Sequence, residues 1–427
     1  MQRKLFLTGS GFLLAGWPLA ASVPHFPENL FENLPMHPAP THANGYKDEE
    51  YWSMIRSFFV QPTGFINLEN GYFSPQPLST LQQHQRREYD INRRTSFFMR
   101  REQEQALKSS HEALASFLGC STEELAITRN TTEALNILIS GYPWQKGDEV
   151  VIGNQDYGSM EAAFLQQQKR YGILVRMAEV PMHPQSDDEV VDAYISRITK
   201  NTRLLHLTHL INLTGQVLPV KKIIDAAHAR GVEVAVDAAH SVAHIDVKMQ
   251  SFDADYVGAS LHKWMCCPLG AGFLLMKKKH ISKIWPLMGD NDYPADDIRK
   301  FEHQGTRPIQ TLLTISDAIR FHESIGGALK EQRLKYLKSY WTSKVDSLHG
   351  VTLNTPAQES RSSAIANFQI KGMTPDELAA KLYNDFKIFT VAINHPVVKG
   401  VRVTPHIFTT TTELDALVEA IKSISGN

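Results

Sequence analysis

The segment Val232–Asp237, with the sequence VEVAVD, is followed by AAH at residues 238–240 and by DYVGASLHKWMCCPLGAGFLLM at residues 255–276. It contains three short apolar runs of strand length, separated by polar residues and glycines. Asp237 ends the first run and Lys263 comes shortly after the second, 26 residues later. Continuous apolar runs of this length are typical of strands that are covered by helices on both faces.

The alternation of short apolar runs and amphipathic stretches continues on both sides of this segment. We expect strands at 125–128, 149–153, 174–180, 204–210, 232–237, 256–259 and 272–276, with helices at 131–140, 159–170 and 220–230. This order predicts an α/β fold with a mostly parallel sheet covered by helices. Ligands of such sheets bind at the carboxyl ends of the strands, where Asp237 stands.

The flanking regions have a different character. Before the alternating region we expect a short helix at 51–60, a strand at 65–71 and one long helix at 78–118. After residue 312 we expect a long helix at 314–348, then a smaller α+β part with strands at 368–371 and 402–404 and helices at 374–385 and 413–424. The predicted domains are therefore an N-terminal segment at 23–75, a large domain at 76–312 and a small C-terminal domain at 313–427.

Composition excludes several classes of partner. The 427 residues are 42% hydrophobic and carry a net charge of -1, so no basic surface recruits nucleic acid. The three cysteines, Cys120, Cys266 and Cys267, are too few for a disulfide framework or a four-cysteine metal site. We expect a folded protein of two or three domains that binds a small molecule.

Residues 1–22, MQRKLFLTGSGFLLAGWPLAAS, have the layout of a secretory signal peptide: a basic start, an apolar stretch and small residues before cleavage. The apolar stretch is short for a stable membrane span. RKLFL at residues 3–7 is similar to the twin-arginine export motif, with Lys4 at the second arginine position. We therefore expect a periplasmic protein, with an uncleaved anchor or an unstructured tail as the alternative.

Asp237 and Lys263 suggest a chemistry. A lysine amine forms an imine with an aldehyde cofactor, and a carboxylate pairs with a protonated pyridine nitrogen. Spacing alone leaves open that Asp237 is a strand-end cap and Lys263 a surface charge.

The segments VAVDAAHSVAHIDV (234–247) and DADYVGASLHKWMCCPLGAGFLLM (253–276) resemble the core of the class V aminotransferase family, in its isopenicillin N epimerase-like branch. The similarity extends from about Ile66 to Leu417. It implies a pyridoxal 5′-phosphate (PLP) enzyme of fold type I, with a seven-stranded sheet, acting on the amino group or α-carbon of an amino-acid-like substrate.

The resemblance also implies roles for individual residues. Lys263 would bind the cofactor and act as general acid and base. Asp237 would pair with the pyridine nitrogen, Tyr157 would stack on the ring, and Arg402 would bind the substrate α-carboxylate. The other implied contacts are Asn212 and His240 near the ring hydroxyl, Thr131, Thr132, Ser260 and His262 at the phosphate, and Gly305 and Thr306 at the phosphate of a neighbouring subunit. This last contact implies a homodimer with a shared active site.

Some of these residues have simpler interpretations. Thr131 and Thr132 would suit a helix N-cap, Tyr157 a core aromatic and Arg402 an exposed strand arginine. The histidines His206, His209, His240 and His244 raise the possibility of a metal site, and so of a metal-dependent hydrolase. No His-Glu-x-x-His motif accompanies them, so we predict no metal.

The sequence leaves the reaction open. Cysteine desulfurases of the family carry a cysteine on a C-terminal loop, whereas this chain has none after Cys267, which argues against desulfuration. Transamination is the favoured reaction. Epimerisation is the alternative and needs a second acid or base, for which Tyr157, His209 or a partner residue is a candidate. Export also suggests a tailoring enzyme for the glutamyl side chain of pyoverdine siderophores, and a non-catalytic PLP-binding protein is a further alternative.

Overall fold

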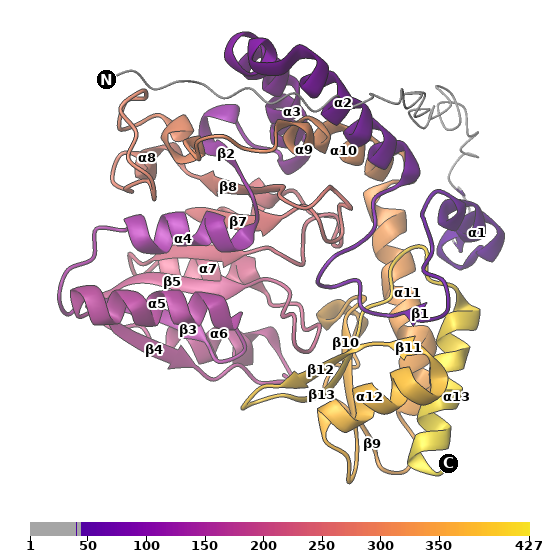
Figure 1. Ribbon diagram of the computed structural model, residues 1–427. Coiled ribbons are helices and arrows are strands. Elements are labelled where there is room, and N and C mark those ends of the chain that lie inside the picture. The colour runs from indigo at the N-terminus through magenta and orange to yellow at the C-terminus, as the bar shows by residue number, and fades with distance from the viewer. Residues whose placement is uncertain (1–39, 41–43) are drawn as a thin grey trace, which may run out of the picture. The chain divides into compact units, whose positions relative to one another are not determined.

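The computed structural model describes residue 40 and residues 44–427. Its largest sheet has seven strands in the order β2 (Leu125–Thr128), β8 (Gly272–Met276), β7 (Tyr256–Ser260), β6 (Glu233–Asp237), β5 (Thr202–Thr208), β3 (Glu149–Gly153) and β4 (Leu174–Ala178). Only β8 runs against the others, because it pairs antiparallel with both β2 and β7. The predicted mostly parallel sheet is confirmed (Figure 1).

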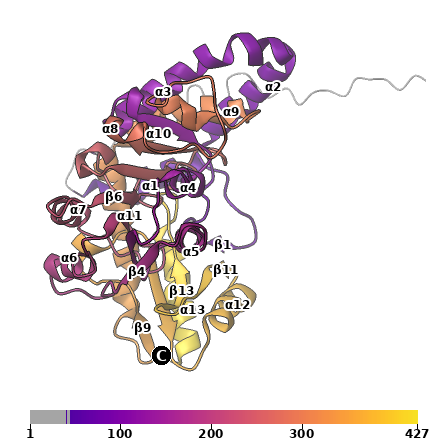
Figure 2. The same cartoon turned by 90° about the vertical axis from the view of Figure 1, so that its left-hand side faces the viewer.

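Helices cover both faces of this sheet, as the continuous apolar runs predicted. Figure 2 shows the strands between α4 (Thr131–Gly141) and α5 (Gly158–Tyr171) on one side and α6 (Asp187–Ile195) and α7 (Val220–His228) on the other. Strands β2, β3, β7 and β8 are buried along their whole length. Their side chains therefore pack against helices on both faces.

A second sheet forms the smaller C-terminal part. Its four antiparallel strands have the order β12 (Val391–Asn394), β13 (Lys399–Val403), β10 (Ala366–Ile370) and β9 (Val351–Leu353). They share an apolar core with α11 (Gly327–Val345), α12 (Pro375–Phe386) and α13 (Thr411–Ser425). The predicted smaller α+β part is present.

The N-terminal segment joins this smaller part. After α1 (Glu49–Ser57), strand β1 (Ile66–Asn67) pairs in parallel with β11 (Ile388–Phe389), and Glu69 forms a bridge with Thr404. The predicted strand at 65–71 is thus only two residues long. The pairing places residues 68–71 beside the end of β13.

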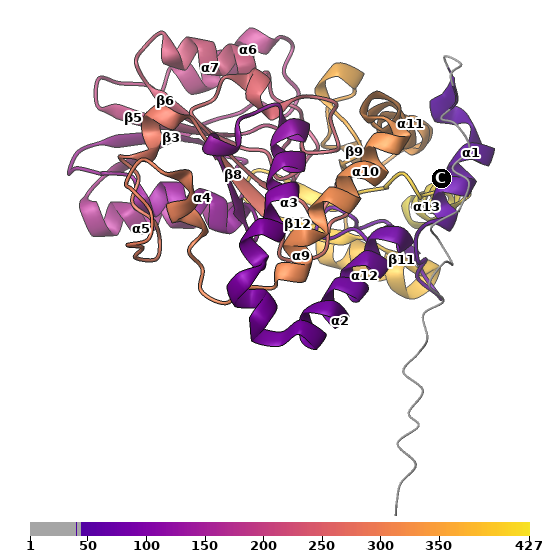
Figure 3. The same ribbon diagram turned by 90° about the horizontal axis from the view of Figure 1, so that it is seen from above.

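Two predicted long helices are each divided in two. The helix expected at 314–348 is α10 (Ile315–Ile325) and α11, because Gly326 has a φ of 92° that breaks helical geometry. The helix expected at 78–118 is α2 (Leu78–Arg101) and α3 (Gln103–Leu118), with a further kink at Thr95. Figure 3 shows α2 and α3 next to α9 (Ile309–Leu313) and α10.

The predicted signal peptide, residues 1–22, lies outside the described residues. Among residue 40 and residues 44–427, no helix is long and apolar enough to cross a membrane.

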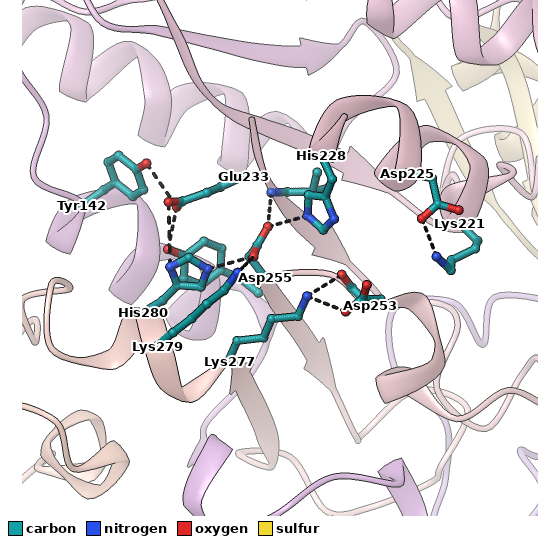
Figure 4. A network of polar contacts seen from close by, with 12 residues as sticks. Tyr142, Lys221, Asp225, His228, Glu233, Asp253, Asp255, Lys277, Lys279 and His280 are labelled. Atoms are coloured by element: carbon teal, nitrogen blue, oxygen red, sulfur yellow. Dashed lines mark hydrogen bonds and ion pairs between the residues drawn. The ribbon is translucent and has the colours of Figure 1, made fainter. Parts of the chain in front are cut away.

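A polar network lies at the edge of the sheet opposite the carboxyl ends of the parallel strands (Figure 4). Asp255, 2% exposed, accepts hydrogen bonds from His228 and His280, each at 2.8 Å, and from the Val234 amide at 2.9 Å. Burial alone would raise the pKa of this carboxyl group, but these hydrogen bonds hold it well below its ordinary value. The network fixes the start of β6 against the start of β7.

Replacing the buried carboxylate should destabilise the fold. We expect Asp255→Asn to lower the free energy of unfolding at pH 7 by about 3 kcal/mol, because charged hydrogen bonds inside the protein are lost. A carboxyl group with a depressed pKa stabilises the protein above its unfolded pKa of about 3.9, and this contribution is lost as pH falls below it. The difference in thermal midpoint between variant and wild type should therefore shrink at pH 3.

Asp253→Asn is the matched control for this experiment. Asp253 is exposed and has a φ of 58°, a conformation that asparagine tolerates. Its variant should unfold close to wild type. Equal stability of the Asp255→Asn and Asp253→Asn proteins would contradict the structural role of the network.

Candidate active site

The carboxyl ends of the parallel strands bring the predicted residues together. Thr208 at the end of β5 is in register with Asp237 at the end of β6, and Asp237 is in register with Gly258 in β7. Ser260, the last residue of β7, lies opposite Gly272 of β8, which in turn lies opposite Thr128 of β2. The edge therefore carries a carboxylate in its middle and hydroxyl groups on both sides, Thr208 on β5 and Ser260 and Thr128 on β7 and β2.

Lys263 lies in the loop after β7, with its amine at this edge. The Nζ atom is 3.1 Å from Nε2 of His240. Burial lowers the pKa of Lys263 to about 8, against an opposing effect of the Asp237 charge. At neutral pH about one tenth of the amine is thus uncharged, far more than for an ordinary lysine, and the uncharged form is the one that reacts with an aldehyde.

His240 is held in one protonation state by its neighbours. The Trp264 indole Nε1–H donates to Nδ1 of His240 at 3.2 Å, and an indole can only donate. Burial and the Lys263 charge hold the pKa of His240 well below its ordinary value, so the ring is neutral. Its proton must then be on Nε2, which points to Lys263, and a lysine that accepts this proton must itself be uncharged.

Asp237 is a buried carboxylate, only 2% exposed. Its Oδ1 accepts a hydrogen bond from the Ala239 amide at 2.8 Å. Burial raises its pKa, and the nearby His206 opposes that effect. A protonated pyridine nitrogen is a cation that would stabilise the ionised carboxylate here, so Asp237 fits the PLP ring.

A second layer of polar groups lies behind Asp237. His206 is fully buried, and within the described part of the chain neither ring nitrogen has a hydrogen-bond partner; burial lowers its pKa to about 4. Asp156 accepts hydrogen bonds from the Thr208 hydroxyl and the Gly153 amide, both at 2.8 Å, and burial raises its pKa to about 7. No sequence pattern marks Asp156 as a site residue.

The start of α4 and the end of β7 form the predicted phosphate end. The Thr131 amide donates to the Ser260 hydroxyl at 2.9 Å, and the two hydroxyl groups are 2.8 Å apart. A Cβ atom at Gly272 would lie 2.7 Å from the Asn130 backbone, so a glycine is needed for this close approach. The N-terminus of α4, an 11-residue helix, offers amides and a positive dipole end to an anion.

His262 and Thr132 flank this group. Nδ1 of His262 is buried and has no hydrogen-bond partner among residues 44–427, and burial lowers the pKa of the ring to about 4. Thr132 is exposed on the first turn of α4. A phosphate group bound at this end could supply the partner that the buried nitrogen of His262 lacks.

The remaining predicted site residues are Tyr157, Gly305, Thr306 and Asn212. Tyr157 precedes α5 and is 44% exposed, so it is not a core aromatic. Gly305 and Thr306 are exposed, and Gly305 has a φ of 66°. Asn212 contributes its backbone carbonyl, which accepts a hydrogen bond from Arg402 at 3.2 Å. Their roles toward the cofactor stay predictions.

Arg402, on β13, is buried rather than an exposed strand arginine, and it already has a carboxylate partner. Its Nη2 and Nε atoms donate to the two oxygens of Glu69, at 2.5 and 3.3 Å. Arg402 and Glu69 are 7% and 9% exposed. The charges of both act on the Lys263 amine, Arg402 lowering its pKa and Glu69 raising it. Nothing in the NLENG turn at residues 67–71 marks Glu69 as a site residue.

Within the described residues, the four histidines considered as metal ligands do not form a group close enough to share a metal ion. His240 contacts Lys263 and Trp264, and His244 contacts the His240 carbonyl and the Ala364 amide. The His209 ring packs against Phe252. Within residue 40 and residues 44–427, the side chains close enough to share a metal are Asp290, Asp292 and His303, none of which belongs to this group.

Comparison with known proteins agrees with this geometry. Residues 74–417 match the model of the aminotransferase class-V family. Among relatives, the isopenicillin N epimerase of Amycolatopsis lactamdurans is 29% identical over 77% of this chain and 87% of its own. A probable cysteine desulfurase of Methanothermobacter thermautotrophicus is 28% identical over 75% and 84%.

Solved structures show the same fold. The cysteine desulfurase of Thermococcus onnurineus has a TM-score of 0.77 at 22% identity, covering 87% of this chain and 97% of its own. A lysine-to-alanine mutant of C-DES, with glycine covalently linked to its PLP cofactor, has a TM-score of 0.78 at 20% identity, covering 85% and 98%. The predicted fold type I architecture and the cofactor are thereby confirmed, and the chain belongs to the class V aminotransferase family of PLP-dependent enzymes.

Proposed function

We propose that this protein is an aminotransferase that takes the amino group from a small amino-acid-like donor, with Lys263 as the residue that binds the cofactor and moves the proton at the reacting carbon. The observation that carries this proposal is the short contact between the Lys263 amine and a neutral, Nε2-protonated His240. Together with the burial that lowers the pKa of Lys263 to about 8, this contact favours the uncharged amine, which is the form that nucleophilic and base chemistry require.

Each group of residues has a separate task. When bound, PLP draws electrons from the substrate carbon and so makes its C–H bond acidic. Asp237 would hold the pyridine nitrogen, and Thr131, Ser260 and His262 would hold the phosphate. His240 orients the Lys263 amine, and the Trp264 indole fixes the His240 ring in the required tautomer.

Transamination suits a site with a single base. It needs a proton to move along one face of the cofactor, which one lysine can do, whereas epimerisation needs a second acid or base on the opposite face. Of the candidates for that second group, His209 packs on Phe252 and its pKa is lowered to about 4 by burial, and Tyr157 is 44% exposed at the start of α5.

Epimerisation is the second candidate, supported by relatives named isopenicillin N epimerase, one of which spans 88% of this chain at 25% identity. Under this alternative Tyr157 would donate the proton from the solvent side.

Desulfuration is disfavoured by the cysteines. None of the three is exposed; Cys266 and Cys267 are buried and Cys120 is partly buried. Burial raises the pKa values of Cys120 and Cys266 to about 11 and that of Cys267 well above its ordinary value. Sulfur transfer requires an accessible thiolate, which these environments suppress.

We further propose export to the periplasm and a homodimer. Residues 1–22 support export by their composition. The exposed Gly305 and Thr306 support a contact with a second subunit. A role in modifying the glutamyl side chain of a pyoverdine siderophore requires such export, and normal levels of the siderophore intermediate in a deletion strain would count against it.

The cofactor and its lysine can be tested together. We expect the purified protein to show a near-visible absorbance band that borohydride bleaches. Reduction should leave the cofactor covalently attached to the peptide that contains Lys263. Lys263→Ala should lack this labelling and lose on the order of 10² to 10⁴-fold in activity, because the general base is absent. A colourless protein that takes up no PLP would refute the proposal.

A donor panel then separates the two reactions. Transamination converts an amino donor into its carbonyl product and requires an acceptor. Epimerisation instead interconverts the D and L forms in deuterated water with deuterium uptake and no carbonyl product. Racemic product without any carbonyl compound would establish the epimerase alternative.

The lowered pKa of Lys263 predicts a pH dependence. The initial rate at which the apoprotein takes up PLP should rise with pH and level off with a midpoint near 8, because the uncharged amine is the reactive form. An unperturbed lysine would have its midpoint near 10.5. Asp237→Asn removes a negative charge that raises this pKa, so its midpoint should move to lower pH; a shift to higher pH would contradict the assignment.

A further inference from the structure

Lys330 is a buried lysine that the proposed function does not use. It is the fourth residue of α11 and is 3% exposed. Burial lowers its pKa to about 8, and within the described chain the groups whose charges oppose this effect are the Cys266 and Cys267 thiols rather than a carboxylate. Buried lysines are ordinarily paired, and the helix dipole opposes a cation near a helix N-terminus. Fold stability alone therefore does not explain a lysine at this position.

The Lys330 amine binds the main chain of the loop that carries Lys263. Its Nζ atom donates a hydrogen bond to the carbonyl oxygen of Trp264, the residue that follows Lys263. The second neighbour of the amine is Nδ1 of His322 on α10, at 3.5 Å. Burial and the Lys330 charge hold the pKa of His322 well below its ordinary value, so this ring is neutral and can accept a hydrogen bond. Lys330 thus joins α11 to the loop beside the reactive lysine.

This loop has a strained backbone. Cys266, two residues after Trp264, has a φ of 59°, in the left-handed region that residues other than glycine rarely adopt. The Cys266 amide donates to the Lys263 carbonyl at 3.2 Å and so closes a tight turn that contains Trp264. The hydrogen bond from Lys330 to the Trp264 carbonyl therefore holds a turn that its own residues do not favour.

The Trp264 side chain extends this constraint to the reacting group. Its ring stacks on His406, with 5.3 Å between the ring centroids, and packs against His244 at 3.8 Å. The indole N–H donates to Nδ1 of His240 at 3.2 Å, and Nε2 of His240 lies 3.1 Å from the Lys263 amine. The contacts from the Trp264 main chain to the Lys263 nitrogen are therefore continuous.

We propose that Lys330 is a positioning residue that holds Trp264 in the orientation that fixes the His240 ring. The His240 ring then keeps its Nε2–H directed at the reactive lysine. This inference rests on the proposed function, because it concerns the lysine that binds the cofactor there.

A direct effect of the Lys330 charge is not part of this role. The charges that shift the pKa of Lys263 belong to Asp237, Arg402 and Glu69. The Lys330 charge acts instead on the titratable groups around it, which are His244, His322, His406, Cys266 and Cys267. An effect of Lys330 on the reactive lysine must therefore pass through Trp264.

The pH dependence of PLP uptake by the full-length apoprotein tests this role. Lys330→Met removes the donor but keeps a long apolar side chain, and it leaves no unpaired charge behind. We expect the midpoint of the uptake rate to rise by about half a pH unit or more, because a released His240 ring can turn and accept a hydrogen bond from the charged form of Lys263. Lys338→Met is the matched control. Lys338 lies about two turns further along α11, is also 3% exposed, and its variant should keep the wild-type midpoint.

A double-variant cycle shows whether the effect passes through Trp264. Trp264→Phe removes the indole N–H, so adding Lys330→Met to that variant should move the midpoint by less than about 0.2 pH unit. Equal shifts in the wild-type and Trp264→Phe backgrounds would show a direct effect of the charge and would overturn the proposal.

The outcomes also separate this inference from the proposed function. A midpoint near 8 in both wild type and Lys330→Met would refute the positioning role and leave the proposed function intact. A wild-type protein that takes up no PLP would refute the proposed function and this inference with it. If Lys330→Met does not fold, Lys330→Leu takes its place with the same expectation. Failure of both variants to fold would show that the lysine is required for folding, which would also overturn the positioning role.

Discussion

The candidate site depends on how the Lys263 amine is held near the buried Asp237 carboxylate. Asp237 and Lys263 come from adjacent parallel strands, and such a pair inside a protein would ordinarily exist as two opposite charges. The Trp264–His240 contact works against that state, because it leaves the His240 proton pointing at the lysine nitrogen. Burial and the positive charge of Arg402 also lower the pKa of Lys263. Under the proposed function, Lys263 would serve as the nucleophile and Asp237 would pair with a cation that the cofactor brings.

The fold explains why these groups meet. All the parallel strands end at one edge, so residues far apart in sequence become neighbours by register alone, as with Thr208, Asp237 and Gly258. The opposite edge is fastened by the Asp255 network, which joins the starts of β6 and β7. Because the network fixes the positions at which β6 and β7 begin, it also fixes the positions of the residues at their carboxyl ends.

Much of this could be predicted from the sequence, for identifiable reasons. Buried parallel strands appear as apolar runs, and their ends carry the reactive residues, so the sheet, Asp237, Ser260 and Lys263 could be placed. The helix breaks at Glu102 and Gly326 and the kink at Thr95 were missed, because no proline marks any of these three positions. Helix α6 was missed because its first turn, Asp187 to Glu189, is acidic and without apolar residues.

Long-range contacts were beyond the reach of sequence patterns. Glu69 and Arg402 are 333 residues apart, and neither propensity nor periodicity encodes their contact. It arises because β1 adds to β11 in the smaller part while the following turn passes the end of β13. The family resemblance suggested a role for Arg402 but not the state of its guanidinium, which depends on one side chain in an irregular segment. The state of the Arg402 guanidinium therefore depends on how the N-terminal segment joins the C-terminal sheet.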